Sequence, residues 1–348
     1  MDLTSYRTLG RSGLIVSPLA LGTMTFGADR WGTSEESSRA VLDAYVNAGG
    51  NFIDTADVYG GGRSEEFVGR YVAERGLRDK LVLGTKFTWN LDPGNPNAGG
   101  NGRKNVHRAL EASLRRLRTD HVDVVWQHFW DMVTPVEEML QTMGDLVRSG
   151  KARYFALSDV PAWYATKMAV LAAAHGVPGP IAIQTEYSLV ERTAEREHLP
   201  AARECGLGLV AWSPLAGGFL TGKYRRADEG RPPNERLRGA NPLGKSKFTE
   251  RNWRILDGVR EVGEAAARTP AQVSLAWTIA RTGVSSVIIG ASSETQLREN
   301  IESLGTMLSA DQLDALSGVS CLEDAFPYAA YTDPIKRSIF GGCDVRAW

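Results

Sequence analysis

Residues 51–86 read NFIDTADVYGGGRSEEFVGRYVAERGLRDKLVLGTK. Two short apolar stretches, at 51–56 and 81–86, flank a charged segment whose apolar residues recur at helical spacing. Two parallel strands need a crossover connection, which is usually a helix. The stretch therefore predicts one strand–helix–strand unit.

The same alternation continues along the chain, with candidate strands at 18–22, 51–56, 81–86, 122–128, 152–158, 180–186, 208–214 and 284–290. Successive strands start 28 to 41 residues apart, except for the last, which starts 76 residues after its predecessor. Eight alternating units favour a closed (β/α)8 TIM barrel of the α/β class. An open doubly wound sheet stays an alternative, because counting strands does not show closure.

Two regions fall outside these units. Residues 6–17 (YRTLGRSGLIVS) predict a small N-terminal hairpin with a Ser-Gly turn. The long gap at 215–283 predicts two helices, near 249–267 and 270–282, as additions on the C-terminal side. No pair of linkers marks a second domain, so we expect one domain over residues 1–348.

Composition excludes several classes of protein. The 348 residues carry a net charge of −1, which gives no reason to expect nucleic acid or an anionic membrane as a partner. No apolar run approaches the roughly 20 residues that span a bilayer, and no secretory signal is visible. Three cysteines without a C-x-x-C spacing predict reduced thiols in a cytoplasmic protein. The oligomeric state cannot be read from the sequence.

Four polar residues follow the ends of three successive predicted strands. Asp54 and Tyr59 belong to the second strand and its loop, Lys86 ends the third, and His128 ends the fourth. Strand ends meet at one mouth in a barrel, where active sites are built. A lysine ammonium can lower the pKa of a tyrosine phenol, a carboxylate can hold that lysine, and a histidine can orient a carbonyl oxygen.

Each of these residues also has a structural interpretation. Asp54 can cap a turn and pair with Lys86, Tyr59 can pack in its loop, and a single histidine is more often structural than catalytic. Lys86 could also form a Schiff base in a barrel aldolase. Their occurrence together at consecutive strand ends favours proton-transfer chemistry.

Several segments resemble the aldo-keto reductases, in the order and spacing of that family: NFIDTADVYGGGRSEE, LVLGTKF, VDVVWQHFWD, QTEYSL, WSPLAGGFLTGKY and VIIGASSETQLRENIESL. The likeness covers about residues 6–320 and is nearest to bacterial members and potassium-channel β subunits. It implies an NADPH-dependent oxidoreductase in which Asp54, Tyr59, Lys86 and His128 form the catalytic tetrad and Tyr59 is the general acid. It implies no metal, in keeping with the lack of a metal-ligand spacing, and the absence of G-x-G-x-x-G argues against a Rossmann site.

The resemblance also implies a cofactor site along the mouth. Ser158, Asp159 and Gln184 correspond to groups that bind the nicotinamide amide, and Trp212 to the aromatic residue that stacks on its ring. The remaining positions are Gly22, Thr23, Met24 and Asp54 near the nicotinamide; Ser213, Pro214, Leu215 and Gly217 along the pyrophosphate; Lys223 and Arg236 at the 2′-phosphate; and Gly290, Ser292, Gln296, Glu299 and Asn300 at the adenosine end. The family most often has Asn where this chain has Asp159, and a carboxylate accepts hydrogen bonds but cannot donate them.

The expected substrate is a small-molecule carbonyl compound. Trp89, Trp31 and Trp130 are candidates to line its pocket beside Tyr59 and His128, although each can equally be packing. The tail at 321–348 is rich in aromatic residues and lies where relatives cover the mouth. These features predict bulky or aromatic aldehydes and ketones, including keto-sugars. The alternative is a regulatory subunit that binds NADP(H) and senses the redox state.

Overall fold

Eight parallel strands close into a barrel in the order β3-β4-β5-β6-β7-β8-β9-β10, and β10 pairs with β3. The structure is a computed structural model that describes residues 1–29, 32–226 and 247–346. The strands are β3 (Leu19–Gly22), β4 (Phe52–Asp54), β5 (Val82–Phe87), β6 (Val122–Gln127), β7 (Ala152–Ser158), β8 (Ala182–Glu186), β9 (Gly208–Trp212) and β10 (Val284–Ile289). This closure confirms the predicted TIM barrel and excludes the open sheet.

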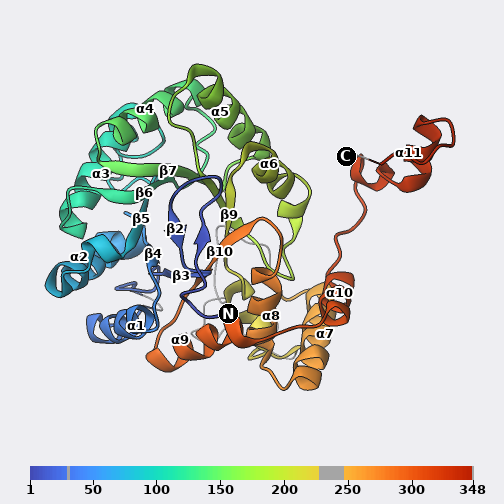
Figure 1. Cartoon of the computed structure of the whole chain (residues 1–348). Helices are drawn as coiled ribbons and strands as arrows, with labels where there is room; N and C mark the ends of the chain where they lie inside the picture. Colours follow the sequence, from blue (N-terminus) through green and yellow to red (C-terminus); the bar gives the residue numbers. More distant parts are fainter. Residues whose placement is uncertain (30–31, 227–246, 347–348) are drawn as a thin grey trace.

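Helices surround the barrel (Figure 1). They are α1 (Glu35–Asn47), α2 (Arg63–Arg75), α3 (Arg103–Leu117), α4 (Val136–Arg148), α5 (Ala162–His175), α6 (His198–Cys205), α7 (Glu250–Ala266), α8 (Pro270–Ile279) and α9 (Glu294–Ile301). Their ends follow local chemistry: Ser34 caps α1 by accepting from the Ser37 N–H, and Pro135 and Pro161 directly precede α4 and α5. α7 and α8 are the two helices expected in the long gap.

The core has two layers because side chains alternate along each strand. On β4, Phe52 points into the barrel, whereas Ile53 packs outward against the helices. The inner layer includes Val82, Val124 and Trp126, with Trp126 among the largest fully buried side chains. The indole of Trp126 fits because Gly84 faces it: a Cβ on Gly84 would lie 2.9 Å from the Trp126 Nε1.

The predicted hairpin forms from β1 (Arg7–Thr8) and β2 (Ile15–Val16). Leu9 and Val16 are fully buried and pack with the inner layer of the barrel. The hairpin therefore closes the end of the barrel where the strands begin, and it leaves the opposite end, the mouth, for the site.

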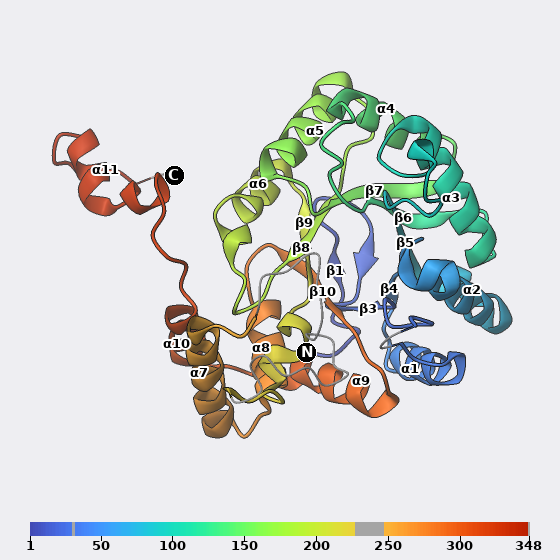
Figure 2. The same cartoon turned by 180° about the vertical axis from the view of Figure 1, so that it is seen from behind.

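The C-terminal tail does not fold back over the mouth. After α10 (Ala310–Val319) the chain runs outward to a short helix, α11 (Asp333–Ile339), which lies apart from the barrel in both views (Figures 1 and 2). Every residue from 331 to 346 is exposed. Over the described ranges, none of the helices combines the length and apolarity needed to span a bilayer.

Candidate active site

Asp54, Tyr59, Lys86 and His128 meet at the mouth. Asp54 is the last residue of β4, Lys86 lies in β5, and His128 follows β6. Tyr59 begins a 3-10 turn at Tyr59–Gly62, which brings its ring back over the strand ends. The ring centroids of Tyr59 and His128 lie 5.8 Å apart in an edge-to-face arrangement. All four residues predicted from their positions at or after strand ends therefore lie close together.

The Lys86 ammonium is the centre of this cluster. It donates to Asp54 Oδ2 across 2.5 Å, to the Thr55 carbonyl across 3.0 Å and to the Tyr59 hydroxyl oxygen across 3.1 Å. These three bonds use all the protons of an ammonium group. Gln184 fixes the other Asp54 oxygen, because its amide donates to Asp54 Oδ1 across 3.0 Å. The side chains of Lys86 and Asp54 are buried, so this ion pair is shielded from water.

The electrostatics of the cluster differ from the simple expectation for Tyr59. Burial raises the pKa of the Tyr59 phenol, and the opposing effect of the Lys86 ammonium is not large enough to reverse that direction. Burial acts to lower the pKa of Lys86, but Asp54 and Tyr59 outweigh it, and the pKa is raised. Burial, and then Lys86, hold the pKa of His128 well below its usual range. Tyr59 is therefore protonated and His128 neutral at pH 7.

Aromatic side chains border this cluster on one side. Trp89 lies edge-to-face with His128, with ring centroids 6.2 Å apart, and also contacts Phe129. Trp130 instead packs against Trp163 and Tyr164. Of the three tryptophans predicted at the substrate pocket, Trp89 lies beside a tetrad residue and Trp130 belongs to a neighbouring aromatic cluster. Trp31 lies outside the described residues.

Of the residues predicted at the nicotinamide amide and ring, Ser158 and Trp212 end β7 and β9, Asp159 follows Ser158, and Gln184 lies within β8. The Ser158 Oγ is buried and has no hydrogen-bond partner among the described residues, which leaves it available to a ligand. Asp159 follows it with a φ of 47°, and the Trp212 indole N–H donates to Asp159 Oδ1 across 3.0 Å. Burial raises the pKa of Asp159 to about 7, although the Trp212 bond acts against this.

The predicted pyrophosphate segment forms a tight turn after β9. Ser213, Ala216 and Gly217 all have positive φ, and the Ser213 Oγ accepts from the Gly217 N–H across 3.1 Å. Leu215 and the buried Pro214 complete the turn. The exposed Lys223 lies over this turn: a Cβ on Gly218 would sit 3.0 Å from the Lys223 Cε. Arg236 lies outside the described residues.

The adenosine-end residues gather where β10 leads into α9. The Gln296 Oε1 accepts from both the N–H and the hydroxyl of Ser292, across 2.8 and 3.0 Å. Asn300 is buried and donates to the Gly290 carbonyl, whereas Glu299 is exposed one turn from Gln296. Gln296, Glu299 and Asn300 therefore lie together on α9, beside Gly290 and Ser292.

The loop after β3 contributes the remaining predicted positions. Thr23 is fully buried, and its hydroxyl is bonded to the Asp54 carbonyl and the Ser64 hydroxyl. Gly22 pairs with Asp54 across the β3–β4 ladder, and Met24 is half-buried in the same loop. Thr23 thus supports Asp54 rather than presenting a free side chain.

A second buried carboxylate group lies behind Tyr59 and was not predicted from the sequence. Glu65 is fully buried in the first turn of α2, where it accepts from the Thr85 hydroxyl and from the Arg116 guanidinium. Burial, and then the Glu65 carboxylate, raise the pKa of Asp57 to about 7. In the part of the chain that the structure describes, Asp57 Oδ1 has no hydrogen-bond partner. Contacts from α3 and β5 enclose Glu65, and no sequence motif signals them.

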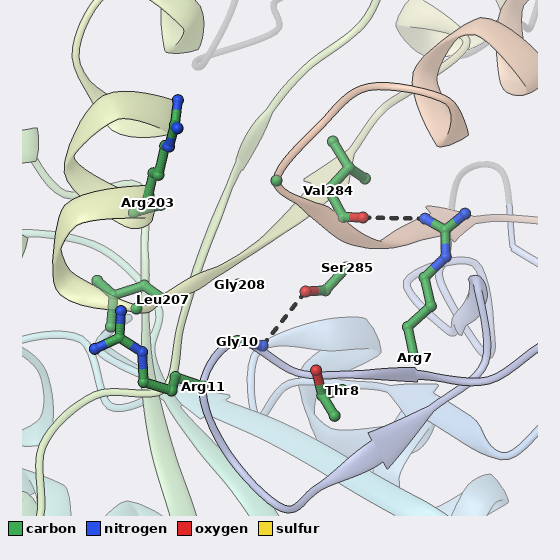
Figure 3. A pocket seen from close by; sticks show the side chains of 12 residues that line it. Arg7, Thr8, Gly10, Arg11, Arg203, Leu207, Gly208, Val284 and Ser285 are labelled. Carbon is green, nitrogen blue, oxygen red and sulfur yellow. Dashed lines mark hydrogen bonds between the residues drawn. The ribbon is translucent and has the colours of Figure 1, made fainter. Parts of the chain in front are cut away.

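A separate cavity of about 330 Å³ lies at the opposite end of the barrel, beside the hairpin (Figure 3). Arg7, Arg11 and Arg203 border it, and the Arg7 guanidinium donates to the carbonyls of Ile279 and Val284. Because this end of a barrel serves stability rather than catalysis, we do not assign the active site there. The described segments contain no His, Cys, Asp and Glu group suited to a metal ion.

Comparison with known proteins agrees with this geometry. The model of the Aldo/keto reductase family matches residues 18–320. The chain belongs to the aldo/keto reductase family. Members of this family are oxidoreductases that generally use NAD(P)H, so the family expectation from the sequence is confirmed.

Three relatives span nearly the whole chain. An uncharacterized oxidoreductase, YrpG of Bacillus subtilis, is 38% identical over 90% of this chain and 95% of its own length. A probable voltage-gated potassium channel subunit beta of Oryza sativa is 36% identical over 90% of this chain and 96% of its own. An aryl-alcohol dehydrogenase [NADP(+)] of Phanerodontia chrysosporium is 33% identical over 92% and 87%.

Proposed function

We propose that this aldo/keto reductase reduces aldehydes and ketones to alcohols with NADPH, and that Tyr59 is the general acid. The observation that carries the proposal is the Lys86 ammonium, which is shared between Asp54 and Tyr59 at the mouth of the barrel. We also propose that residues 1–348 act as one domain.

The residues around the mouth fit a dinucleotide. The buried Ser158 Oγ without a partner and the Asp159 carboxyl suit a carboxamide, which offers both a donor and an acceptor. The Trp212 indole N–H, at the edge of the ring, donates to Asp159, which leaves a face of the ring for stacking. Lys223 beside the turn after β9 provides positive charge for phosphate groups. The NADP+ in the name of the Phanerodontia relative supports the choice of NADPH over NADH.

NADPH, when bound, would supply a hydride to the carbonyl carbon. The Tyr59 hydroxyl then gives its proton to the developing alkoxide, and the Lys86 ammonium stabilises the phenolate that is left. Asp54 holds the ammonium in place, while Gln184 fixes the second Asp54 oxygen. The raised pKa of Tyr59 suits this direction, because the phenol stays protonated until the substrate needs a proton.

His128 is proposed to orient the substrate. A neutral imidazole can donate one hydrogen bond to the carbonyl oxygen without adding a second cation beside Lys86. The depressed pKa of His128 supports the neutral form. Its Nδ1 is buried and accepts or donates no hydrogen bond within the described residues, so no hydrogen bond fixes that ring nitrogen.

We propose aromatic carbonyl compounds as the substrate class. Trp89 packs edge-to-face against His128 and provides an apolar surface beside the catalytic residues proposed here. A flat aromatic ring can pack against such a wall while its carbonyl group reaches Tyr59. The aryl-alcohol dehydrogenase among the relatives supports this assignment.

A regulatory role is the second candidate, because a potassium-channel β subunit is among the relatives. Steady-state turnover separates the two functions: a reductase consumes NADPH with a panel of aromatic aldehydes, whereas a sensor binds it without turnover. The aldolase alternative loses support, because all three ammonium protons of Lys86 are committed and its pKa is raised. A Schiff-base lysine needs the opposite shift.

A further inference from the structure

Over the described ranges, the contacts between the C-terminal tail and the barrel lie near the start of the tail, here called its root. The Arg196 guanidinium donates to the Glu323 carbonyl and lies over the Tyr328 ring, and the Tyr328 hydroxyl bonds to Glu197. Arg196 and Glu197 follow β8, so this root lies on the rim of the mouth. Beyond it, residues 331–346, here called the free tail, are exposed throughout.

The free tail has an apolar face that nothing in the described chain covers. Ile335 and Ile339 lie four residues apart on α11 and therefore share one face, and Phe340 follows directly. Ile339 is 72% exposed. A helix of seven residues is not stable in water without tertiary packing, because nucleation costs more than so short a helix recovers. The helix therefore needs a surface to pack on.

A matching apolar surface lies on the mouth of the barrel. Trp89, Leu91, Met132, Val133 and Trp163, here called the mouth patch, are all exposed. The first four lie in the segments that connect β5 and β6 to the helices that follow, and Trp163 lies in the first turn of α5, which follows β7, so they share one side of the mouth. Met132 and Val133 are 71% and 84% exposed, and contiguous exposed apolar residues commonly mark an interaction site.

We propose that the free tail packs on the mouth patch of a second copy of this chain, and that the exchange is reciprocal. The tail projects away from its own barrel in both views (Figures 1 and 2), and Ile335, Ile339 and Phe340 are exposed on it. A twofold dimer makes the same contact twice. Each tail then needs to provide only about half of the roughly 1,600 Å² that a stable interface buries.

The charges near the two surfaces are complementary. Asp92 and Asp131 adjoin Leu91 and Met132 of the mouth patch in the sequence, and the Asp131 carboxylate accepts from the Asn101, Val133 and Thr134 N–H groups. The free tail carries Lys336, Arg337 and Arg346 against Asp333 and Asp344, which leaves it one positive charge in excess. Arg337 is bonded to Asp344 within the tail, and Lys336 would face Asp92 and Asp131 in the proposed contact.

The contact would place part of one copy at the active site of the other. Trp89 belongs to the mouth patch and also touches His128, so a tail on this patch would border the substrate entrance. This consequence rests on the proposed function, whereas the association itself does not. The partner's tail would then take the place of a cover that the chain does not provide to its own mouth.

Association can be measured without cofactor or substrate, by sedimentation velocity and equilibrium of the full chain. We expect a dimer whose dissociation constant rises at least tenfold in the double variant Ile335→Asp, Ile339→Asp, and likewise in Val133→Asp. The control is Met307→Asp, which adds one negative charge, as Val133→Asp does. Met307 is 92% exposed and lies outside both the free tail and the mouth patch, so this variant should dimerise like the wild type.

Mixing the tail variant with Val133→Asp provides a second test. The tail variant retains an intact patch and Val133→Asp an intact tail, so a mixture restores one of the two contacts. We expect heterodimers that associate more tightly than either variant alone. A full chain that stays monomeric, a dimer that no variant weakens, or a mixture that gains nothing would each overturn the proposal. Such a result would leave the proposed reductase activity untouched.

Discussion

The Trp212 indole N–H donates to Asp159 Oδ1 across 3.0 Å and thereby links the end of β9 to the loop after β7. Asp159 sits at a positive φ, a conformation that Asp tolerates better than most residues. Burial raises the pKa of its carboxyl to about 7. The side chain therefore changes charge near neutral pH, at the position proposed for the nicotinamide amide.

Asp159→Asn should bind NADPH as tightly as the wild type or more tightly, and remain an active reductase. The advantage should grow with pH, because above about 7 the wild-type carboxylate is ionised and repels a phosphate-bearing ligand. We expect a gain of about two- to tenfold at pH of about 8.5, and almost none at about 6. Tryptophan fluorescence titration with NADPH measures the affinity of both proteins at each pH. A folded variant with no activity would contradict this prediction.

The same carboxyl predicts a pH dependence of stability. Its pKa is raised on folding, so its contribution is fully present below the unfolded value of about 4 and is lost as pH rises through about 7. Between about pH 5 and 8.5 the wild type should therefore lose more unfolding free energy than Asp159→Asn. Denaturant unfolding at both pH values tests this, and parallel losses in the two proteins would count against it.

Tyr59→Phe should lower kcat by about 10²- to 10⁴-fold, because it removes the proposed proton donor. It leaves Asp54 and Lys86 paired, so NADPH affinity should change by less than about threefold. Circular dichroism controls for folding. Retention of kcat within about tenfold of the wild type would remove Tyr59 from the proposed role.

The imidazole of His128 should stay neutral across the range in which exposed histidines titrate. Burial and Lys86 both lower its pKa, so no His128 transition should appear near pH 6.5 in an NMR titration. Loss of a histidine signal in His128→Gln assigns that signal to His128. A His128 transition near 6.5 would show that the ring is more hydrated than the structure indicates.

A step in the pH profile of activity near pH 7 should come from Asp159. It should disappear in Asp159→Asn and persist in variants of the other histidines.

Arg116→Met should destabilise the fold by about 3 kcal/mol, because it leaves the buried Glu65 carboxylate without its cationic partner and close to Asp57. Adding Glu65→Gln should recover part of that loss, since the unpaired charge is removed. Arg115→Met, an exposed change on the same helix, serves as the control and should stay within about 0.5 kcal/mol of the wild type. Equal losses for the single and double variants would contradict the pairing.

The barrel and the tetrad could be predicted because both depend on local patterns. Strand periodicity locates each strand, and parallel closure brings Asp54, Lys86 and His128 to one end without any knowledge of side-chain packing. Of the residues predicted at the adenosine end, Gln296, Glu299 and Asn300 share α9, so their proximity also follows from spacing. These parts of the site need no information about distant contacts.

The features that were missed depend on tertiary burial. Glu65 lies in the first turn of α2, a common place for an acidic residue, and it is enclosed by Arg116 of α3 and Thr85 of β5. The bond between Asp159 and Trp212 joins residues 53 positions apart. The direction of the Tyr59 pKa depends on how far burial outweighs one ammonium group, which no motif encodes. The outward course of the tail likewise has no local signal.

The most direct test of the proposed function follows NADPH consumption with an aromatic aldehyde, in the wild type and in Tyr59→Phe, after NADPH binding has been titrated in both. We predict NADPH-selective binding by both proteins, turnover by the wild type, and loss of turnover in the variant. Binding without turnover by the wild type would contradict the reductase function and favour the regulatory one. Turnover that survives in Tyr59→Phe would contradict the proposed mechanism.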